Sequence, residues 1–468
     1  MVRNEVSIVF YGGVGEVGGN KILLKDKGYE ANIFLDFGKS FELARKFYEF
    51  PFTYPESIQE LIDIGAVPRI TGLYTKASYK DKDFDFSKEV KPPVDAVFIS
   101  HAHLDHYGHI SLLNRKIPIY IGEAARNILL TSIKLISRIA TPELFYKGLI
   151  FNTFKTKDEI IISGERGDIL IEPIHVDHSI PGAYGFIIHT SIGVIAYTGD
   201  FRKHGPQSNL SEDFIRRLEE LNIKALITEA THAHYSELLN EREVEDKIRT
   251  VVELSDRLII ADFSRSDLDR FVTFYRVARI TGRKLVIDAK RFLILESVLN
   301  SPGIRVKGID LHRDDILIYK EERKIKYAWE KELFSRFPEE KFVSLSEIKK
   351  DPEKYIFTVM FGGASDIKKL KPPSGSIYIL SSSEPVNEER EISFEKLLNW
   401  LEHFGVAVFH IHCSGHATAL EIKELIERAD PEIVIPIHTE RPKYIANFMK
   451  HRKWIIPEGR GSRIVIVS

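Results

Sequence analysis

The sequence predicts an α/β protein in which one α/β unit is inserted into another. Three observations lead to this fold class. Strand-like runs dominate residues 1–235, strands and helices alternate over residues 236–400, and residues 401–468 return to a strand–helix–strand order. Strands that alternate with helices are typical of parallel sheets with crossover helices. We therefore assign residues 1–235 and 401–468 to one domain and residues 236–400 to an inserted domain.

The N-terminal segment has the pattern of a β-hairpin. The strand-like "VSIVF" is followed by "NKILLK", a "DKG" turn and "ANIFLDFG". Gly13, Gly15 and Gly18 also match the G-x-G-x-x-G pattern of dinucleotide-binding proteins, with Asp36 beyond them. That pattern needs a helix directly after the glycines. Because a strand follows instead, we reject dinucleotide binding and expect the glycines to allow tight turns or a close approach.

The remaining elements of the first domain follow in order. Residues 38–93 read as an insertion that contains one short helix, over "PESIQELIDIG". "VDAVFIS" has the composition of a buried strand, and a helical run covers roughly residues 122–148. Three further strands are expected in "GDILIEPIHVDHS", "YGFIIHT" and "GVIAYTGD".

Composition excludes several classes of protein. The 468 residues carry a formal net charge of −2, so a site for a polyanion must be a local patch or be supplied by bound metal. The single cysteine, Cys413, excludes a disulfide framework and any cysteine-based zinc cluster. No apolar run approaches the roughly 20 residues that span a bilayer. We expect a soluble cytoplasmic protein without a membrane partner.

The segment "HAHLDHYGH", residues 101–109, contains four histidines and an aspartate in nine positions. His101 and His103 lie two apart, which places both imidazoles on one side of an extended segment. Asp105 and His106 follow where the chain turns into a helix. One pair can serve one metal ion and the next pair a second. Imidazole and carboxylate together suit zinc, with manganese as the alternative.

This motif resembles the signature of the metallo-β-lactamase fold, an αββα sandwich, and the resemblance implies further site residues. The strand-end aspartate of the family matches Asp36 in "IFLDFG", and its bridging aspartate matches Asp200 in "AYTGDF". Its third histidine motif matches "HVDHSIPG", which offers both His175 and His178. The "HSIPG" context favours His178.

The inserted unit and the histidines after it resemble the β-CASP branch of this fold, whose members process nucleic acids. The acidic motif of that branch matches Glu229, and its later histidine motifs match His416 in "HCSGHA" and His438 in "IPIHTE". A histidine at the last position is typical of members that act on RNA. "GGVGEVGGN" and "HCSGHA" are most similar to ribonuclease J. The sequence departs from that pattern at Cys413 and Thr439, and we expect neither the C-terminal domain of bacterial ribonuclease J nor the KH module of archaeal relatives.

The resemblance implies a centre with two zinc ions. The expected ligands are His101, His103 and His178 for the first ion, Asp105, His106 and His438 for the second, and Asp200 between them. The expected catalytic residues are Asp105, His416 as general acid, Glu229 as the residue that orients it, and Asp36, which fixes an imidazole from outside.

Six residues are expected to bind substrate. "DFSRSDLDR" and "SSSEPVNEER" resemble nucleotide-contacting loops of ribonuclease J, and their serines precede helical runs whose N-termini can hold phosphate. Capping of those helices is the alternative role. The "HCSGHA" segment contributes two more side chains. The six residues are Ser264, Ser266, Ser382, Ser383, His412 and Ser414.

We therefore expect a zinc-dependent ribonuclease that hydrolyses phosphodiester bonds as a 5′-to-3′ exonuclease, with endonuclease action as a second mode. The expected partner is single-stranded RNA with a 5′-monophosphate, and a homodimer is left open. The alternatives are a DNA nuclease, a small-molecule hydrolase of the same fold and a catalytically silent RNA-binding subunit.

Overall fold

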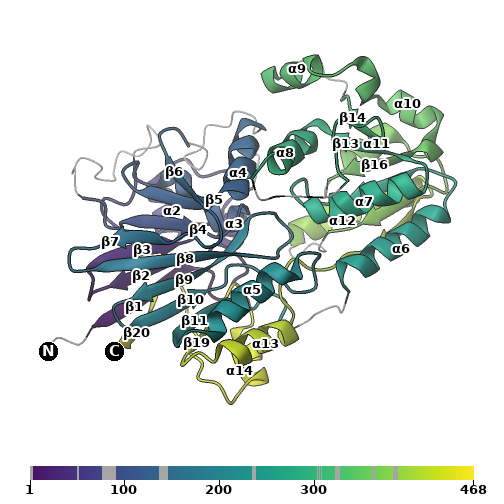
Figure 1. The fold of residues 1–468 in the computed structure, drawn as a ribbon. Coiled ribbons are helices and arrows are strands. Elements are labelled where there is room, and N and C mark those ends of the chain that lie inside the picture. The colour runs from purple at the N-terminus through teal and green to yellow at the C-terminus, as the bar shows by residue number, and fades with distance from the viewer. Residues whose placement is uncertain are drawn as a thin grey trace. The chain divides into compact units, whose positions relative to one another are not determined.

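The computed structural model describes residues 4–49, 52–75, 91–135, 146–234, 239–302, 304, 306, 308–321, 327–360, 364–382 and 388–467. The chain forms two compact units (Figure 1). The first comprises Met1–Leu129, Ile136–Ser236 and Gly415–Ser468, and the second comprises Leu130–Leu135 and Glu237–Ser414.

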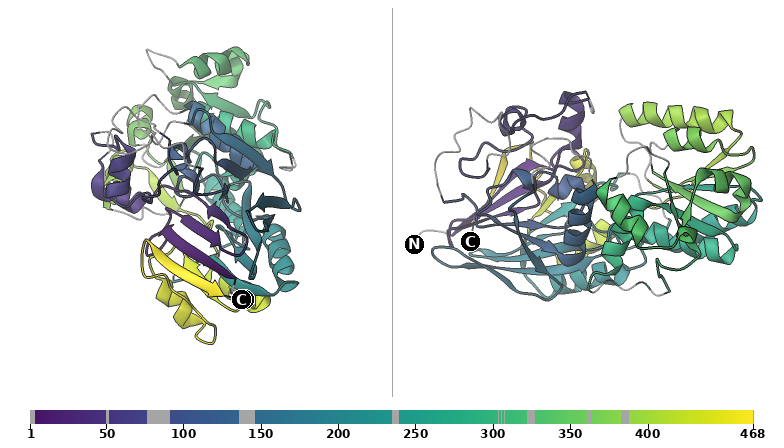
Figure 2. Two further views of the ribbon diagram at one scale, coloured as in Figure 1. Left: turned by 90° about the vertical axis from the view of Figure 1, so that its left-hand side faces the viewer. Right: turned by 90° about the horizontal axis from the view of Figure 1, so that it is seen from above.

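The first unit contains two sheets. One has the order β20-β1-β2-β3-β4-β5-β6, with antiparallel pairs from β20 to β3 and parallel pairs from β3 to β6. Its strands are β1 (Glu5–Gly12), β2 (Lys21–Asp26), β3 (Ala31–Leu35), β4 (Ala96–Ile99), β5 (Pro118–Gly122), β6 (Ile150–Phe154) and β20 (Ser462–Val467). β1 and β20, from opposite ends of the sequence, lie side by side (Figure 2). β1 pairs directly with β2 as a hairpin, which confirms that no helix follows the glycine run.

The second sheet of this unit has the order β19-β11-β10-β9-β8-β7. Its strands are β7 (Ile160–Ser163), β8 (Asp168–Val176), β9 (Ala183–Thr190), β10 (Gly193–Tyr197), β11 (Ile223–Glu229) and β19 (Val434–Ile437). β10, β11 and β19 are parallel to one another, whereas β9 is antiparallel to both of its neighbours. The three strands that the sequence predicts after residue 160 are therefore present as β8, β9 and β10.

Apolar side chains from both sheets form one core, with fully buried Ile8 and Phe98 from the first sheet and Phe186 and Ile227 from the second. A second apolar cluster joins the latter sheet to α5 (Ser208–Glu219), α13 (Ala419–Ala429) and α14 (Pro442–Phe448). α1 (Phe41–Phe47) and α2 (Ile58–Asp63), drawn in purple, lie on the opposite side of the sheets from α5 (Figure 2). The described residues of this part also form α3 (Leu104–Tyr107), η1 (Ile110–Leu112) and α4 (Glu123–Leu135), of which Leu130–Leu135 groups with the second unit. The first unit is thus a layered α/β sandwich, the predicted fold class.

The second unit is built on a parallel sheet with the order β15-β14-β13-β16-β12-β17-β18. Its strands are β12 (Ile259–Asp262), β13 (Lys284–Asp288), β14 (Ile316–Tyr319), β15 (Phe342–Val343), β16 (Tyr355–Val359), β17 (Ile377–Leu380) and β18 (Ala407–His410). Its helices are α6 (Glu241–Glu253), α7 (Leu268–Ile280), α8 (Ala289–Leu299), α9 (Ala328–Ser335), η3 (Glu339–Lys341), α10 (Leu345–Lys350), η4 (Pro352–Lys354), α11 (Ala364–Leu370) and α12 (Glu388–His403).

The end of the insert differs from the sequence-based boundary at residue 400. β18 pairs in parallel with β17, and the chain groups with the second unit up to Ser414. Of the helix expected over residues 122–148, α4 covers Glu123–Leu135, and residues 136–145 lie outside the described part of the chain. The predicted short helix in the 38–93 segment is α2, whereas α1 was not predicted. Among the helices of the described ranges, none combines the length and apolar character needed to cross a bilayer.

Candidate metal centre

Six strand ends of the first unit meet at one place and present the polar residues that the sequence analysis selected. Asp36 follows β3, His101 follows β4 and His178 follows β8. Asp200 follows β10, Glu229 ends β11 and His438 follows β19. Asp36 and His438 adopt left-handed backbone conformations, with φ of 57° and 53°. Such conformations are strained for residues other than glycine and gather at functional sites.

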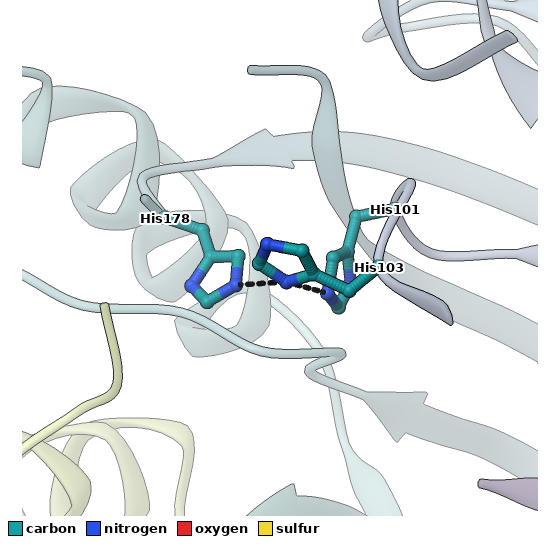
Figure 3. A group of neighbouring side chains, drawn as sticks. All are labelled: His101, His103 and His178. Carbon is teal, nitrogen blue, oxygen red and sulfur yellow. Dashed lines mark hydrogen bonds between the residues drawn. The ribbon is translucent and has the colours of Figure 1, made fainter. Parts of the chain in front are cut away.

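Three imidazoles form the first group of candidate ligands (Figure 3). His103 Nδ1 lies 3.0 Å from His101 Nε2 and 3.2 Å from His178 Nε2. Burial lowers the pKa of all three rings, that of His103 to about 4. The rings are therefore neutral near pH 7, which is the form in which imidazole binds a metal ion.

The second group contains Asp105, His106 and His438. His438 Nε2 lies 3.2 Å from Asp105 Oδ2 and 3.3 Å from His106 Nε2. Asp105 and His106 come from α3, directly after His101 and His103 in sequence, whereas His438 comes from the C-terminal part of the chain. The expected ligands of the second ion are thus brought together.

Asp200 lies between the two groups. Its Oδ2 is 3.1 Å from His106 Nε2, 3.6 Å from His101 Nε2 and 3.7 Å from His438 Nε2. Burial alone would raise the pKa of this carboxyl, but His106 and His438 outweigh burial and lower the pKa well below its usual range. Asp200 therefore stays ionised and faces both groups.

Partners outside the centre fix the orientation of the imidazoles. His101 Nδ1 lies 3.0 Å from Ser100 Oγ, and His178 Nδ1 lies 2.5 Å from the carbonyl oxygen of Gly415. His438 Nδ1 lies 2.7 Å from Thr231 Oγ1. In each ring one nitrogen is engaged outside, so the other is presented to the centre, as metal-binding histidines usually require.

Asp36 fixes His106 in the same way. Its Oδ2 lies 2.8 Å from His106 Nδ1 and also accepts hydrogen bonds from the hydroxyls of Tyr197 at 2.6 Å and Ser100 at 2.9 Å. Its Oδ1 accepts from the Ser100 backbone N–H at 2.7 Å. Asp36 is fully buried and belongs to neither ligand group.

His416 and Glu229 form a pair at the margin of the centre. His416 Nδ1 lies 2.9 Å from Glu229 Oε2 and 3.7 Å from Asp200 Oδ2. Burial lowers the pKa of His416, but Glu229 and Asp200 more than compensate and raise it to about 9. Glu229 is itself held by the Phe201 backbone N–H, which donates to Oε1 at 2.8 Å.

The chemistry of the donor set fits metal ions. Two ligands of a tetrahedral zinc ion lie about 3.3 Å apart, given zinc–nitrogen distances of roughly 2.0–2.1 Å. The nitrogen–nitrogen distances of 3.0 to 3.3 Å within the two groups match this spacing. Asp200 Oδ1 is buried and has no hydrogen-bond partner among the described residues. Since a buried carboxylate oxygen is rarely left without a partner, a cation beside Asp200 accounts for it.

Two family models match parts of the chain. A beta-lactamase superfamily domain matches residues 71–249, and a Zn-dependent metallo-hydrolase RNA specificity domain matches residues 406–455. The two matches flank most of the second unit and contain every candidate ligand. Over these two ranges the chain is similar to the beta-lactamase superfamily domain and to the RNA specificity domain.

Full-length relatives extend the likeness over most of the chain. Ribonuclease J of Mycoplasma pneumoniae is 25% identical over 370 residues, which cover 76% of this chain and 59% of the relative. Ribonuclease J of Helicobacter pylori strain 26695 is 23% identical over 463 residues, which cover 94% of this chain and 56% of the relative. The chain thus spans less than two thirds of the length of these relatives.

One solved structure shares the fold of this chain. A protein of unknown function from Enterococcus faecalis V583 superposes with a TM-score of 0.74 at 24% identity and covers 99% of this chain and 100% of the other. At this identity the likeness shows the fold alone.

Two other histidines of the superfamily motifs lie outside the ligand groups. His175 stacks on Tyr184 with ring centroids 4.9 Å apart, and burial lowers its pKa to about 4. His109 is buried beside η1 and, among the described residues, belongs to none of the groups that could hold a metal. His232 lies next to the centre, since its ring centroid is 5.6 Å from that of His416.

The expected substrate-binding residues belong to the second unit. Ser264 and Ser382 follow the neighbouring strands β12 and β17, and Ser264 Oγ lies 3.3 Å from Ser266 Oγ. His412 stacks on His410, whose Nε2 lies 3.2 Å from the Ser382 carbonyl oxygen. Ser414 ends the unit. Ser383 lies outside the described residues.

Apart from Asp36, sequence reasoning missed the residues that hold the candidate ligands in place. The Thr231 hydroxyl contacts His438 and the Tyr197 hydroxyl contacts Asp36, and no motif marks either residue. Ser100 does have a local signal, because a serine directly before the first histidine of "HAHLDH" is placed to contact its ring.

Proposed function

We propose that this chain is a zinc-dependent ribonuclease of ribonuclease J type, with two ions bound between the six ligands described above and Asp200 bridging them. One observation carries the proposal. A single buried carboxylate, Asp200, faces both ligand groups, and one of its oxygens lacks a hydrogen-bond partner among the described residues. Sites with two neighbouring cations are typical of enzymes that hydrolyse phosphodiesters.

Two divalent cations at this place would supply an attacking hydroxide near neutral pH and neutralise the charge that develops on the phosphoryl oxygens. The contribution of the protein is to fix the ligands in advance. Asp36, Thr231 and the Gly415 carbonyl keep the imidazoles oriented, so little reorganisation is needed when substrate binds.

His416 is the general acid of this proposal. Its Nδ1 faces Glu229, so Nε2 is the atom that would deliver a proton to the leaving 3′ oxygen. Glu229 stabilises the protonated ring and fixes its orientation. General acid catalysis of this kind contributes about 10²- to 10⁴-fold in rate.

RNA is the substrate that the comparisons favour. The metallo-hydrolase RNA specificity domain covers residues 406–455, a range that includes both His416 and His438. Curated relatives over most of the chain carry the name ribonuclease J. A preference for single-stranded RNA with a 5′-monophosphate, 5′-to-3′ direction and action in the cytoplasm remain predictions from the sequence, as do the roles of Ser264, Ser266, Ser382, Ser383, His412 and Ser414.

The experiment is a cleavage assay on end-labelled RNA that carries either a 5′-monophosphate or a 5′-triphosphate, with a DNA of the same sequence as the matched control. We expect mononucleotide release from the monophosphate RNA, little from the triphosphate RNA, and none after chelation. If the DNA were cut at the same rate, the chain would be a nuclease without preference for RNA, and the proposal would be wrong. Cleavage that survives full removal of metal would refute it.

Metal analysis separates catalysis from simple RNA binding. Elemental analysis of the purified chain should find two zinc ions per molecule, and His416→Ala should retain both while it loses cleavage. A variant that binds RNA and cuts it at the original rate would refute the role of His416.

A further inference from the structure

The glycine-rich loop between β1 and β2 touches two candidate ligands of the second ion. The His438 backbone N–H donates to the Gly13 carbonyl oxygen at 2.7 Å, and Val14 forms an isolated parallel bridge with Thr439. The Asn20 backbone N–H donates to the Asp105 carbonyl oxygen at 3.0 Å. The glycine-rich loop, whose sequence matches the dinucleotide-binding pattern, is therefore packed against the candidate metal centre.

Gly18 makes the closest approach. Its φ is +83°, and a Cβ added there would lie 2.6 Å from Asp105 Cβ and 2.6 Å from Asp105 Oδ2. Separations below 3.0 Å are essentially never seen for real Cβ atoms, so a side chain at position 18 and Asp105 in its present place exclude each other.

The backbone at Asp105 has little room to shift, because a second glycine packs directly against it. A Cβ added at Gly38 would lie only 1.6 Å from the Asp105 carbonyl oxygen. Nearby, the Lys39 backbone N–H donates to the Leu104 carbonyl oxygen at 2.9 Å. Gly38 and Lys39 thus pack against the backbone of α3 at Asp105, and Gly18 packs against the Asp105 carboxylate.

We propose that Gly18 is a positioning residue for the second ion: the absence of a side chain there sets the place of the Asp105 carboxylate relative to His106 and His438. This inference rests on the two-ion centre of the proposed function and goes beyond it. A methyl group at position 18 displaces Asp105 Oδ2, which now lies 3.2 Å from His438 Nε2. The three nearest atoms to that methyl group all belong to Asp105, so the group formed by His101, His103 and His178 keeps its geometry.

The same loop provides a matched control. Gly15 also has a positive φ, +68°, but a Cβ added there meets nothing within 4 Å. Alanine at either position carries the backbone strain of a left-handed conformation. Only alanine at position 18 adds the contact with Asp105.

The experiment is a titration of zinc ions into metal-free wild type, Gly15→Ala and Gly18→Ala, with bound zinc counted by elemental analysis. We expect two ions in the wild type and in Gly15→Ala. In Gly18→Ala we expect one ion at the original affinity and a second that binds about 10- to 100-fold more weakly. Two ions at wild-type affinities in Gly18→Ala, or the same loss in Gly15→Ala, would overturn the inference.

A double-mutant cycle covers the case in which Gly18→Ala folds poorly. Asp105→Gly removes the three atoms that the added methyl group would meet, so Gly18→Ala should shift the urea midpoint of metal-free protein far less in that background than in the wild type. Equal shifts in the two backgrounds would show that Asp105 is not what the methyl group meets. Neither readout uses RNA, so a chain that binds two ions and cuts no RNA refutes the proposed function while the test of Gly18 still stands.

Discussion

The hydroxyl of Tyr197 donates a hydrogen bond of 2.6 Å to Asp36 Oδ2, and both side chains are fully buried. The same oxygen of Asp36 faces His106 Nδ1 at 2.8 Å. Tyr197 therefore acts on the candidate metal centre indirectly. It fixes the Asp36 carboxylate, which in turn orients the His106 imidazole. Outer partners of this kind tune metal affinity without touching the metal.

Replacement of Asp36 should weaken the binding of the second ion. We expect Asp36→Asn to reduce its affinity by about 10- to 100-fold, because His106 loses the carboxylate that orients it. Tyr197→Phe should have a smaller effect, since the Ser100 N–H and hydroxyl still bind Asp36. Zinc titration measures both. Tyr275→Phe, which removes a hydroxyl that contacts Asp315 in the second unit, is the control and should leave zinc binding unchanged.

Thr231 should matter through its hydroxyl alone. Thr231 Oγ1 lies 2.7 Å from His438 Nδ1 and donates to the His438 carbonyl oxygen at 2.9 Å. Thr231→Val retains the shape of the side chain and removes both contacts, so we expect weaker binding of the second ion and unchanged binding of the first. Thr250→Val on α6, whose hydroxyl donates to the Asp246 carbonyl oxygen, is the exposed control. Identical zinc binding in Thr231→Val and wild type would contradict the role of Thr231.

Glu229→Gln should separate catalysis from metal binding. The neutral amide cannot stabilise a protonated His416, so we expect kcat on RNA to fall by about 10²- to 10⁴-fold while KM and zinc content stay the same. The matched control is Glu172→Gln, because Glu172 Oε1 also faces a histidine, His189 Nε2 at 2.5 Å, on β8 and β9. That variant should cut RNA at the wild-type rate.

Bound metal should stabilise the fold. Ligands that bind only the folded chain raise its stability by about 2.7 kcal/mol at a free concentration of 100 times Kd. We therefore expect chelation to lower the Tm and zinc to restore it, as followed by calorimetry. In Asp200→Asn the restored increment should shrink, because the carboxylate that faces both groups is lost.

Asp262 should make the second unit more stable near pH 4 than near pH 7. Burial raises the pKa of Asp262 to about 6, although the Tyr378 hydroxyl and Arg291 act against burial. An unfolded aspartate has a pKa of about 3.9, so the folded chain binds the extra proton and its stability falls as pH rises from about 4 through 6. The loss is roughly 3 kcal/mol at most.

The comparison with Asp262→Asn isolates this effect. The asparagine in the variant stays neutral at every pH. The free energy of unfolding in urea should therefore rise for the variant relative to the wild type between pH 4 and pH 7, and the difference should stay constant above pH 7. A difference in free energy of unfolding that does not change with pH would show that Asp262 is not perturbed by burial.

Much of the centre could be predicted because its residues sit in short local patterns. "HAHLDH" places four candidate ligands within six positions after a buried strand, and the structure brings them together. His178 could be separated from His175 only by its neighbours "SIPG", since both histidines follow the same apolar run. The structure places His178 beside His103 and His175 against Tyr184.

Contacts made across the fold left no local pattern. Thr231 meets His438 at a separation of 207 residues, and Tyr197 meets Asp36 at a separation of 161. Neither residue type stands out in its own segment. The glycine run is visible in the sequence, but its role depends on the approach of Asp105 in α3 to Gly18, which spacing alone cannot reveal. The sequence-based boundary falls before β18 because the strand-like run "VAVFHIH" can join either sheet, and only its pairing with β17 places it in the second unit.

His438 stands 332 positions after its neighbour His106. Synthesis proceeds from the N-terminus, so a growing polypeptide can gather the early histidines long before the late one has left the ribosome. Any unfinished product that stops short of His438 carries an incomplete centre. The second ligand group can therefore be completed only when the C-terminal segment has folded back onto the N-terminal half.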